Sequence, residues 1–264
     1  MRTILVINSK GGSGKSTLTT NLASYFASHN LRTAILDCDP QGSCLQWLRQ
    51  RPAHFMPIHG ANGAPASGAT QLASQKRWVP ENSEVQIIDA PAGVKGLQLK
   101  ELVRKSQYIL IPVLPSPVDI HATADFVKDL YLVGGARSAH AQIAVVANRV
   151  RQSSPVYEPL ERFLTSLKLP MLSRITDSDH YIHAAGSGIG VYEMDEATTR
   201  KERLEFLPIL NWLGEQLLAT PEPVAAPAET PVVERTGRFA DLYSTGKMVI
   251  ANILSATGRF KIKP

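Results

Sequence analysis

The first thirty residues of this chain combine a short apolar run, a glycine-rich turn and a helical pattern. Residues 2–8, RTILVIN, have the composition of a buried strand, and residues 15–29 place apolar side chains at helical spacing. The turn between them, SKGGSG at 9–14, contains three glycines, which allow backbone conformations that a Cβ would hinder. A strand that leads through such a turn into a helix is typical of a βαβ unit, so we expect a parallel sheet.

The same alternation continues along the chain. Further strands are expected at 32–39, 55–59, 84–91, 108–115, 142–150 and 169–175, and helices near 43–51, 70–78, 97–105, 119–133, 156–168 and 200–219. Short, continuously apolar strands are typical of sheets that are covered on both faces. The sequence therefore predicts an α/β fold with a doubly wound, mostly parallel sheet and helices on both faces.

Composition and charge divide the chain into three parts. Its 264 residues can hold one domain, expected at 1–219, followed by a Pro/Ala-rich linker at 220–234 and a basic tail at 235–264. The tail has six basic residues and one acid, which leaves 22 of each sign elsewhere (28 − 6 and 23 − 1). This basic tail can be a solubilising terminus or a contact for a polyanion, and a moderately amphipathic helix is possible within 237–256.

Hydropathy and cysteine content point to a cytoplasmic protein. The sequence has no apolar run of about 18 residues, which a membrane-spanning helix requires. Its two cysteines, Cys38 and Cys44, fit a reducing compartment and form no metal cluster by themselves.

The glycine-rich turn predicts a phosphate site. Backbone N–H groups of such a turn, together with the N-terminus of the following helix, attract phosphate oxygens. We expect Lys15 to neutralise the β- and γ-phosphates, Ser16 to bind Mg²⁺ and Thr17 to lie near the α-phosphate. The sequence therefore predicts a nucleotide site with ATP and Mg²⁺ as cofactors.

Three aspartates are expected at the same edge of the sheet. Asp89 ends an apolar strand, and Asp37 and Asp39 end another. We expect Asp37 and Asp89 to serve the magnesium shell and Asp39 to orient the attacking water. Alternatively, Asp37 and Asp39 cap the turn that follows their strand.

Five motifs in this order resemble the ParA/MinD family of deviant-Walker ATPases, in particular its small ParA branch. They are KGGSGKST (10–17), DCDPQGS (37–43), IIDAPAG (87–93), PVLPSPVDI (112–120) and VANRV (146–150). The resemblance covers about residues 2–218. It implies a nucleotide-binding set of Gly11, Gly12, Ser13, Gly14, Lys15, Ser16, Thr17 and Asn148, the last of these contacting adenine. It also implies catalytic roles for Lys10, Lys15 and Asp39, and it places Asp119 near a dimer interface.

Lys10 matches the signature lysine of this family, which contacts the ATP of the other subunit. A second cation beside Lys15 would be redundant for a single triphosphate and would cost like-charge repulsion. Placed against the partner's γ-phosphate, it would instead act in trans, a kind of contribution worth about 10³-fold in related phosphoryl transfer. A homodimer with ATP between its subunits is therefore expected.

The resemblance also suggests what such a dimer does. Arg200, Lys201 and Arg203 are candidates for a basic face that binds DNA without sequence preference. The expected function is to position a cargo such as a plasmid, a chromosome region or a protein complex on the nucleoid, with an activating partner protein. The alternative is a MinD-like, membrane-cycling ATPase, and the tail can serve a partner, DNA or a membrane. A metabolic P-loop enzyme is disfavoured by Lys10, and an iron–sulfur reductase is disfavoured by the low cysteine content.

One segment fits the resemblance only loosely. Within residues 176–195, the side chains of Asp177, Asp179, His180 and His183 could form a metal site. Surface histidines in a loop explain the same pattern.

Overall fold

The fold was analysed in a computed structural model, which describes residues 1–64, 79–136, 139–151 and 169–215. The helices expected at 70–78 and 156–168, the linker and the basic tail lie outside the described residues. The chain divides into two units, Met1–Phe206 and Leu207–Pro264. The domain boundary expected at 219 therefore stays a prediction, and the sheet and site described below belong to the first unit.

Among the described residues, seven strands form one sheet, and every neighbouring pair in it is parallel. Its order is β3-β2-β4-β1-β5-β6-β7. The strands are β1 (Arg2–Val6), β2 (Thr33–Asp37), β3 (Ile58–Asn62), β4 (Val85–Asp89), β5 (Tyr108–Val113), β6 (Gln142–Val150) and β7 (Met171–Thr176). Strand β1 lies between β4 and β5, so the strand order reverses beside it and opens a crevice at the carboxyl ends of the strands. The predicted parallel sheet is confirmed.

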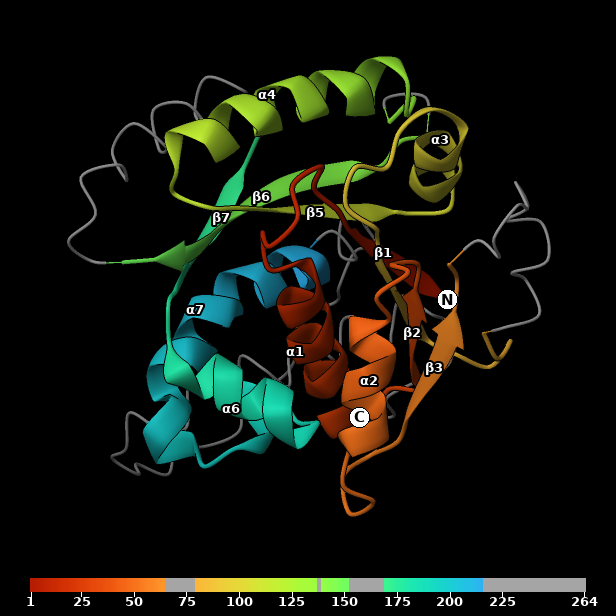
Figure 1. The fold of residues 1–264 in the computed structure, drawn as a ribbon. Helices are drawn as coiled ribbons and strands as arrows, with labels where there is room; N and C mark the ends of the chain where they lie inside the picture. The colour runs from red at the N-terminus through yellow and green to blue at the C-terminus, as the bar shows by residue number, and fades with distance from the viewer. Residues whose placement is uncertain (65–78, 137–138, 152–168, 216–264) are drawn as a thin grey trace, which may run out of the picture. The chain divides into compact units, whose positions relative to one another are not determined.

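Helices cover both faces of this sheet (Figure 1). Helices α3 (Gly96–Arg104) and α4 (Pro117–Leu132) lie on one face, and α1 (Lys15–Ser28), α2 (Ser43–Gln50) and α6 (Asp179–Ser187) lie on the other. A 3₁₀ turn, η2 (Val191–Glu193), and helix α7 (Glu196–Glu215) follow. This layering is the doubly wound arrangement that the alternating pattern predicts.

The apolar side chains of the strands are buried beneath these helices. On the α3/α4 face they form a core with members from strands β1 to β6 and from these two helices, including Leu5, Ile88, Ile109, Leu102 and Phe126. Each fully buried side chain of this size contributes about 2 kcal/mol of transfer free energy. This core fixes the positions of the strand ends, where the polar side chains gather.

Two elements differ from the expectation. The third strand was expected at 55–59 but begins at Ile58, because Pro57 has no N–H to donate to the ladder that pairs Thr33 with Ile58. Residues 179–187, expected as a loop, form α6 instead. Ser178 caps this helix by accepting a hydrogen bond from the His180 amide.

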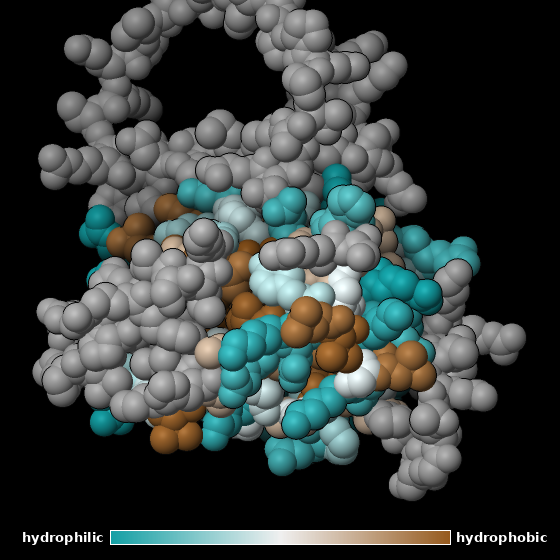
Figure 2. Space-filling view, turned by 90° about the horizontal axis from the view of Figure 1, so that it is seen from above, coloured by the Kyte–Doolittle hydropathy of each residue, from teal (hydrophilic) through white to brown (hydrophobic). Residues whose placement is uncertain are grey.

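Some large apolar side chains remain exposed on the α3/α4 side. They are Leu97, Val118, Leu132 and Val133. Figure 2, which views the molecule from the side on which α4 lies in Figure 1, shows brown patches interrupted by teal ones. Single exposed apolar residues are common on protein surfaces and do not by themselves define an interface.

Candidate functional site

The glycine-rich loop leaves the end of β1 and enters α1 at the crevice of the sheet. Gly12 (φ +74°) and Gly14 (φ +89°) are in the left-handed region, which favours glycine. Ser9, which occupies the first glycine position of the usual pattern, accepts a hydrogen bond on its carbonyl from the Gly93 amide (2.9 Å). The loop is therefore fastened to the segment after β4, and this contact uses only the backbone of Ser9.

Lys15, the first residue of α1, is buried within the loop. Its Nζ donates to the Lys10 carbonyl oxygen (3.2 Å). Burial lowers the pKa of Lys15, and the charges of Asp89 and Asp39 oppose that effect. The ammonium group thus lies between the loop backbone and two carboxylates, where it can neutralise phosphate oxygens.

Ser16 and Asp89 form the centre of the predicted metal site. The Ser16 hydroxyl donates to Asp89 Oδ2 (2.7 Å), and the Cys44 thiol donates to the same oxygen (3.1 Å). Burial raises the pKa of Asp89 to about 6, although both donors oppose the shift. Asp89 Oδ1 is buried and has no hydrogen-bond partner among the described residues. An unpartnered carboxylate oxygen beside a serine hydroxyl suits a magnesium ion and its water shell.

Asp37 and Asp39 have different surroundings. Asp37 is fully buried, and Oδ2 accepts hydrogen bonds from the amides of Cys44 and Leu45, in the first turn of α2. Its Oδ1 accepts one from the Asp39 amide, so Asp37 stabilises the turn that follows β2 and also the first turn of α2, whereas the alternative interpretation had the acids cap the turn alone. Burial raises its pKa against these donors. Asp39 is partly exposed and bonds the Gln41 amide (2.9 Å), and the metal and water roles of the two acids stay predictions.

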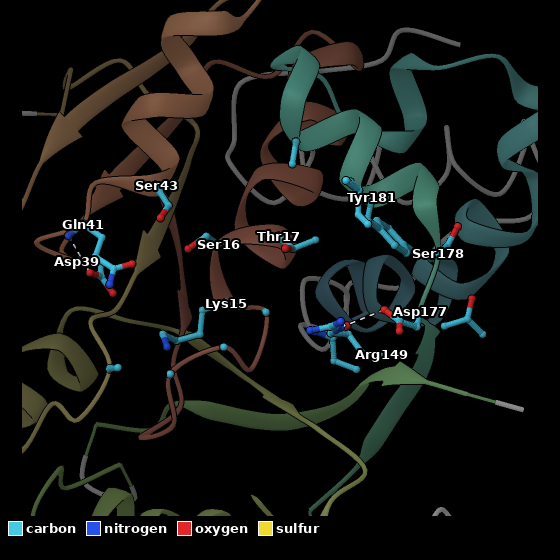
Figure 3. A pocket seen from close by; sticks show the side chains of 18 residues that line it. Lys15, Ser16, Thr17, Asp39, Gln41, Ser43, Arg149, Asp177, Ser178 and Tyr181 are labelled. Carbon is cyan, nitrogen blue, oxygen red and sulfur yellow. Dashed lines mark hydrogen bonds and ion pairs between the residues drawn. The ribbon is translucent and has the colours of Figure 1, made fainter. Parts of the chain in front are cut away.

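A cavity of about 570 Å³ opens at this loop. Figure 3 shows Lys15, Ser16 and Thr17 between two sides: Asp39, Gln41 and Ser43 line one, and Arg149, Asp177, Ser178 and Tyr181 line the other. A volume of this size is within the range of small-molecule sites. The loop residues Gly11, Gly12 and Gly14 also line the cavity.

Asn148 contacts the loop at the end of β6. Its Nδ2 donates to the Ser13 carbonyl oxygen (2.8 Å) and lies 1.9 Å from where a Cβ on Gly14 would be. The next residue, Arg149, has a left-handed φ of +52°, and the register between β6 and β7 shifts at this point. The Arg149 guanidinium pairs with Asp177 (3.0 Å) beside the cavity. Asn148 is thus placed between the loop and the cavity, where the resemblance predicts contact with adenine.

The far side of the cavity was missed by the sequence analysis. We call it the β7–α6 wall, and it consists of Thr176, Asp177, Ser178, Tyr181, Ile182 and Ala185. Glu205 of α7 accepts hydrogen bonds from the amide and hydroxyl of Thr176, and Glu202 accepts one from the Ser178 hydroxyl (2.6 Å). The sequence signal was the pair Ser178-Asp179 after a strand, which is typical of a helix N-terminus.

Lys10 does not line the cavity. Its backbone is held by the loop, since its amide donates to Asn8 Oδ1 (3.2 Å) and its carbonyl accepts from Lys15. Within the described residues, its ammonium group makes no hydrogen bond or ion pair. The charge of Lys10 is therefore not used by the cavity of its own chain.

The predicted basic face of α7 is smaller than expected. Arg200 and Lys201 are exposed, but the Arg203 guanidinium turns inward and donates to the carbonyl oxygens of Val191 and Met194. Arg203 therefore stabilises η2 and the start of α7 rather than presenting charge to solvent.

Two of the four candidate metal ligands near α6, Asp177 and His180, are paired with other protein groups. Asp177 bonds Arg149 and Arg151, and His180 Nδ1 lies 2.9 Å from Glu202 Oε1. In the part of the chain that the structure describes, no three histidine, cysteine or acidic side chains are grouped as metal ligands. None of the described helices is long and apolar enough to cross a bilayer.

Comparison with known families agrees with this geometry. The sequence pattern of the CobQ/CobB/MinD/ParA nucleotide-binding domain matches residues 4–191. The chain belongs to this family. The predicted resemblance to ParA/MinD proteins is confirmed, and the matched domain is described as nucleotide-binding.

Similar proteins share much of the chain. The maintenance of carboxysome distribution protein A of Halothiobacillus neapolitanus is 25% identical over 216 residues, covering 79% of this chain and 94% of that protein. Protein IncC of Escherichia coli is 37% identical over 251 residues, covering 81% of this chain and 69% of IncC. A plasmid partition protein of Borrelia burgdorferi bound to AMPPNP has a similar fold, with a TM-score of 0.63 at 14% identity, over 80% of this chain and 99% of that one.

Proposed function

We propose that this protein is an ATP-dependent dimerising ATPase of the ParA type that positions a cargo. The observation that carries the proposal is a cavity at the glycine-rich loop, with Lys15 and the Ser16–Asp89 pair beside it, next to a second lysine that does not line this cavity. Family membership supports nucleotide binding, and the AMPPNP bound to the Borrelia plasmid partition protein supports ATP as the nucleotide.

Different residues bind different parts of the nucleotide in this proposal. The amides of Gly11 to Gly14 and the N-terminus of α1 receive the phosphates, with Lys15 as the neutralising charge. Asn148 Nδ2 donates to the Ser13 carbonyl, and Oδ1, which accepts no hydrogen bond from the described residues, accepts one from the adenine amino group. The β7–α6 wall packs against the base and ribose, with the apolar surface of Tyr181 and Ile182.

Ser16, Asp37 and Asp89 would hold magnesium and its water shell. When bound, Mg²⁺ neutralises charge on the phosphate oxygens. Asp39 lines the cavity near Lys15, and its carboxylate can accept a proton from or orient a water molecule there.

Lys10 is the element that makes the site depend on a second subunit. Its ammonium group lies outside the cavity of its own chain and has no partner among the described residues. Opposed to the γ-phosphate of a second copy, it would gain a charged partner and add the cation that the transition state needs. ATP would then hold the dimer together, and hydrolysis would loosen it.

Three variants test this division of labour. Lys15→Ala is expected to lose nucleotide binding, whereas Lys10→Ala is expected to keep binding but to lose dimerisation with AMPPNP and stimulated hydrolysis. The matched control is Lys128→Ala, which removes an exposed lysine of α4. Binding can be measured with a fluorescent nucleotide and mass by light scattering. An AMPPNP-bound dimer formed normally by Lys10→Ala would contradict the proposal.

To position a cargo, the protein also has to bind a cellular surface, and we propose that this surface is DNA. Arg200 and Lys201 are exposed, and non-specific DNA binding through such residues weakens steeply with salt. Replacing both with alanine is expected to reduce the slope of log K against log salt concentration for ATP-dependent DNA binding by about two. Lys100→Ala on α3 serves as the control. An unchanged slope would contradict the DNA role. ATP-dependent flotation with anionic vesicles would favour membrane cycling instead.

The relatives suggest the kind of cargo. The Halothiobacillus protein is named for carboxysome distribution, and the Borrelia protein is described by plasmid partition. We propose a plasmid, a chromosome region or a protein complex as the cargo, an activating partner protein that stimulates hydrolysis, and a nucleoid-associated location in the cytoplasm.

A further inference from the structure

Two buried carboxylates lie side by side at the metal site. Asp37 and Asp89 are register partners on the adjacent strands β2 and β4, and both are fully buried. Like charges on neighbouring side chains repel one another, and hydrogen-bond donors to each carboxylate offset this repulsion. Asp37 receives backbone amides, but the donors that the structure shows for the Asp89 carboxylate are two side chains, Ser16 and Cys44.

Cys44 touches both acids. It is the second residue of α2, and its amide donates to Asp37 Oδ2 (3.0 Å) while its thiol donates to Asp89 Oδ2 (3.1 Å). With Ser16 and Cys44 both on Oδ2, that oxygen has two donors, and the buried Oδ1 has none among the described residues. The two donors therefore fix which oxygen of Asp89 stays available.

We propose that Cys44 is a positioning residue for the magnesium site: its thiol holds the Asp89 carboxylate with Oδ1 free for the metal's water shell. This inference rests on the proposed function, because it assigns a role within that nucleotide site. Without the thiol, Ser16 is the one remaining donor to Oδ2 among the described residues, and the carboxylate can turn more freely about its Cβ–Cγ bond. Because the Cys44 amide donates to Asp37 and the Cys44 thiol donates to Asp89, this one residue connects the two acids.

The chain supplies a matched control for this role. Cys38 is as fully buried as Cys44, but its thiol has no hydrogen-bond partner among the described residues. Its Sγ instead lies against the backbone near Gly63, where an added Cβ would be 2.7 Å away. Removing either thiol costs similar packing, so a difference between the two variants reports the contact with Asp89.

The first experiment measures how Mg²⁺ tightens the binding of a fluorescent adenine nucleotide. Loss of an outer-shell partner commonly weakens metal affinity by about tenfold, and we expect Cys44→Ala to raise the Mg²⁺ concentration needed by about that factor. Cys44→Ser, which keeps a donor, and Cys38→Ala should both remain close to the unsubstituted protein. An unchanged Mg²⁺ dependence in Cys44→Ala, or an equal shift in Cys38→Ala, would overturn the inference.

The second experiment needs no nucleotide. Infrared S–H stretching bands can be compared in the two single-cysteine variants, Cys38→Ala and Cys44→Ala. The Cys44 band is expected at lower frequency than the Cys38 band, because the Cys44 thiol donates a hydrogen bond to a carboxylate. Coincident bands at the frequency of a free thiol would overturn the contact. If the unsubstituted protein shows no Mg²⁺-dependent nucleotide binding, the proposed function fails, and this outcome is distinct from a failure confined to Cys44→Ala.

Discussion

Burial of Asp89 makes the stability of this protein depend on pH, and Asp89→Asn should remove that dependence. The pKa of Asp89 is raised from an ordinary value of 3.8 to about 6. Between these pH values the folded state binds more protons than the unfolded state. The free energy of unfolding therefore falls as the pH rises through this window and levels off above pH 6. A shift of about two pKa units corresponds to about 3 kcal/mol.

The measurement is urea unfolding of both proteins from about pH 4 to about pH 7. Asparagine keeps an oxygen that can accept from Ser16 and Cys44, but it has no proton to lose in this range. Across the window, the unsubstituted protein should lose about 3 kcal/mol more than Asp89→Asn. Part of this difference is the repulsion between Asp89 and the neighbouring Asp37.

The control is Asp125→Asn, which removes an acid of α4 whose side chain is 78% exposed. This variant should retain the pH dependence of the unsubstituted protein. Parallel curves for the unsubstituted protein and Asp89→Asn would refute the reasoning, because they would show that burial at this position does not favour the protonated carboxyl. The same ionisation should weaken Mg²⁺-dependent nucleotide binding below about pH 6.

Two further predictions concern the cavity. Gly14→Ala should reduce nucleotide affinity far more than Gly12→Ala. Both glycines have positive φ, but an added Cβ would lie 1.9 Å from Asn148 Nδ2 at Gly14 and would meet open space at Gly12. Equal losses of affinity in a fluorescent-nucleotide titration would contradict this reasoning. Glu205→Gln should raise KM for the nucleotide about fivefold with kcat unchanged. The reason is that the hydrogen bonds that hold Thr176 in the β7–α6 wall would weaken by about 1 kcal/mol. A fall in kcat at unchanged KM would assign Glu205 a different role.

The sequence was informative wherever a local pattern carries the physics. Apolar runs bounded by turns identified the strands of the central sheet, because a strand buried on both faces has to be apolar throughout. The loop between β1 and α1 was equally readable, since left-handed backbone at Gly12 and Gly14 requires glycine. The polar edge strand β3, with the sequence IHGAN, carries no such pattern and was placed three residues too early.

The candidate site was only half readable from the sequence. The loop and the acids belong to motifs that are contiguous in the chain, and the cavity contains Lys15, Ser16 and Asp39 as expected. The β7–α6 wall was missed because its residues come from a strand end and a helix whose relation to the loop depends on β6 and β7 joining the sheet. The inward turn of Arg203 was missed for the same reason, since carbonyl groups of η2 set it.

Sequence by itself therefore determined the parallel α/β architecture, the glycine-rich loop that we propose binds phosphate, and the identity of the charged groups near it. Tertiary structure decided which of those groups meet. Strand order makes Asp37 and Asp89 neighbours, although 52 positions separate them in the chain, and the start of α2 brings Cys44 between them. Residue type and spacing report backbone preference and burial, whereas the partner of a buried carboxylate depends on which strands lie side by side.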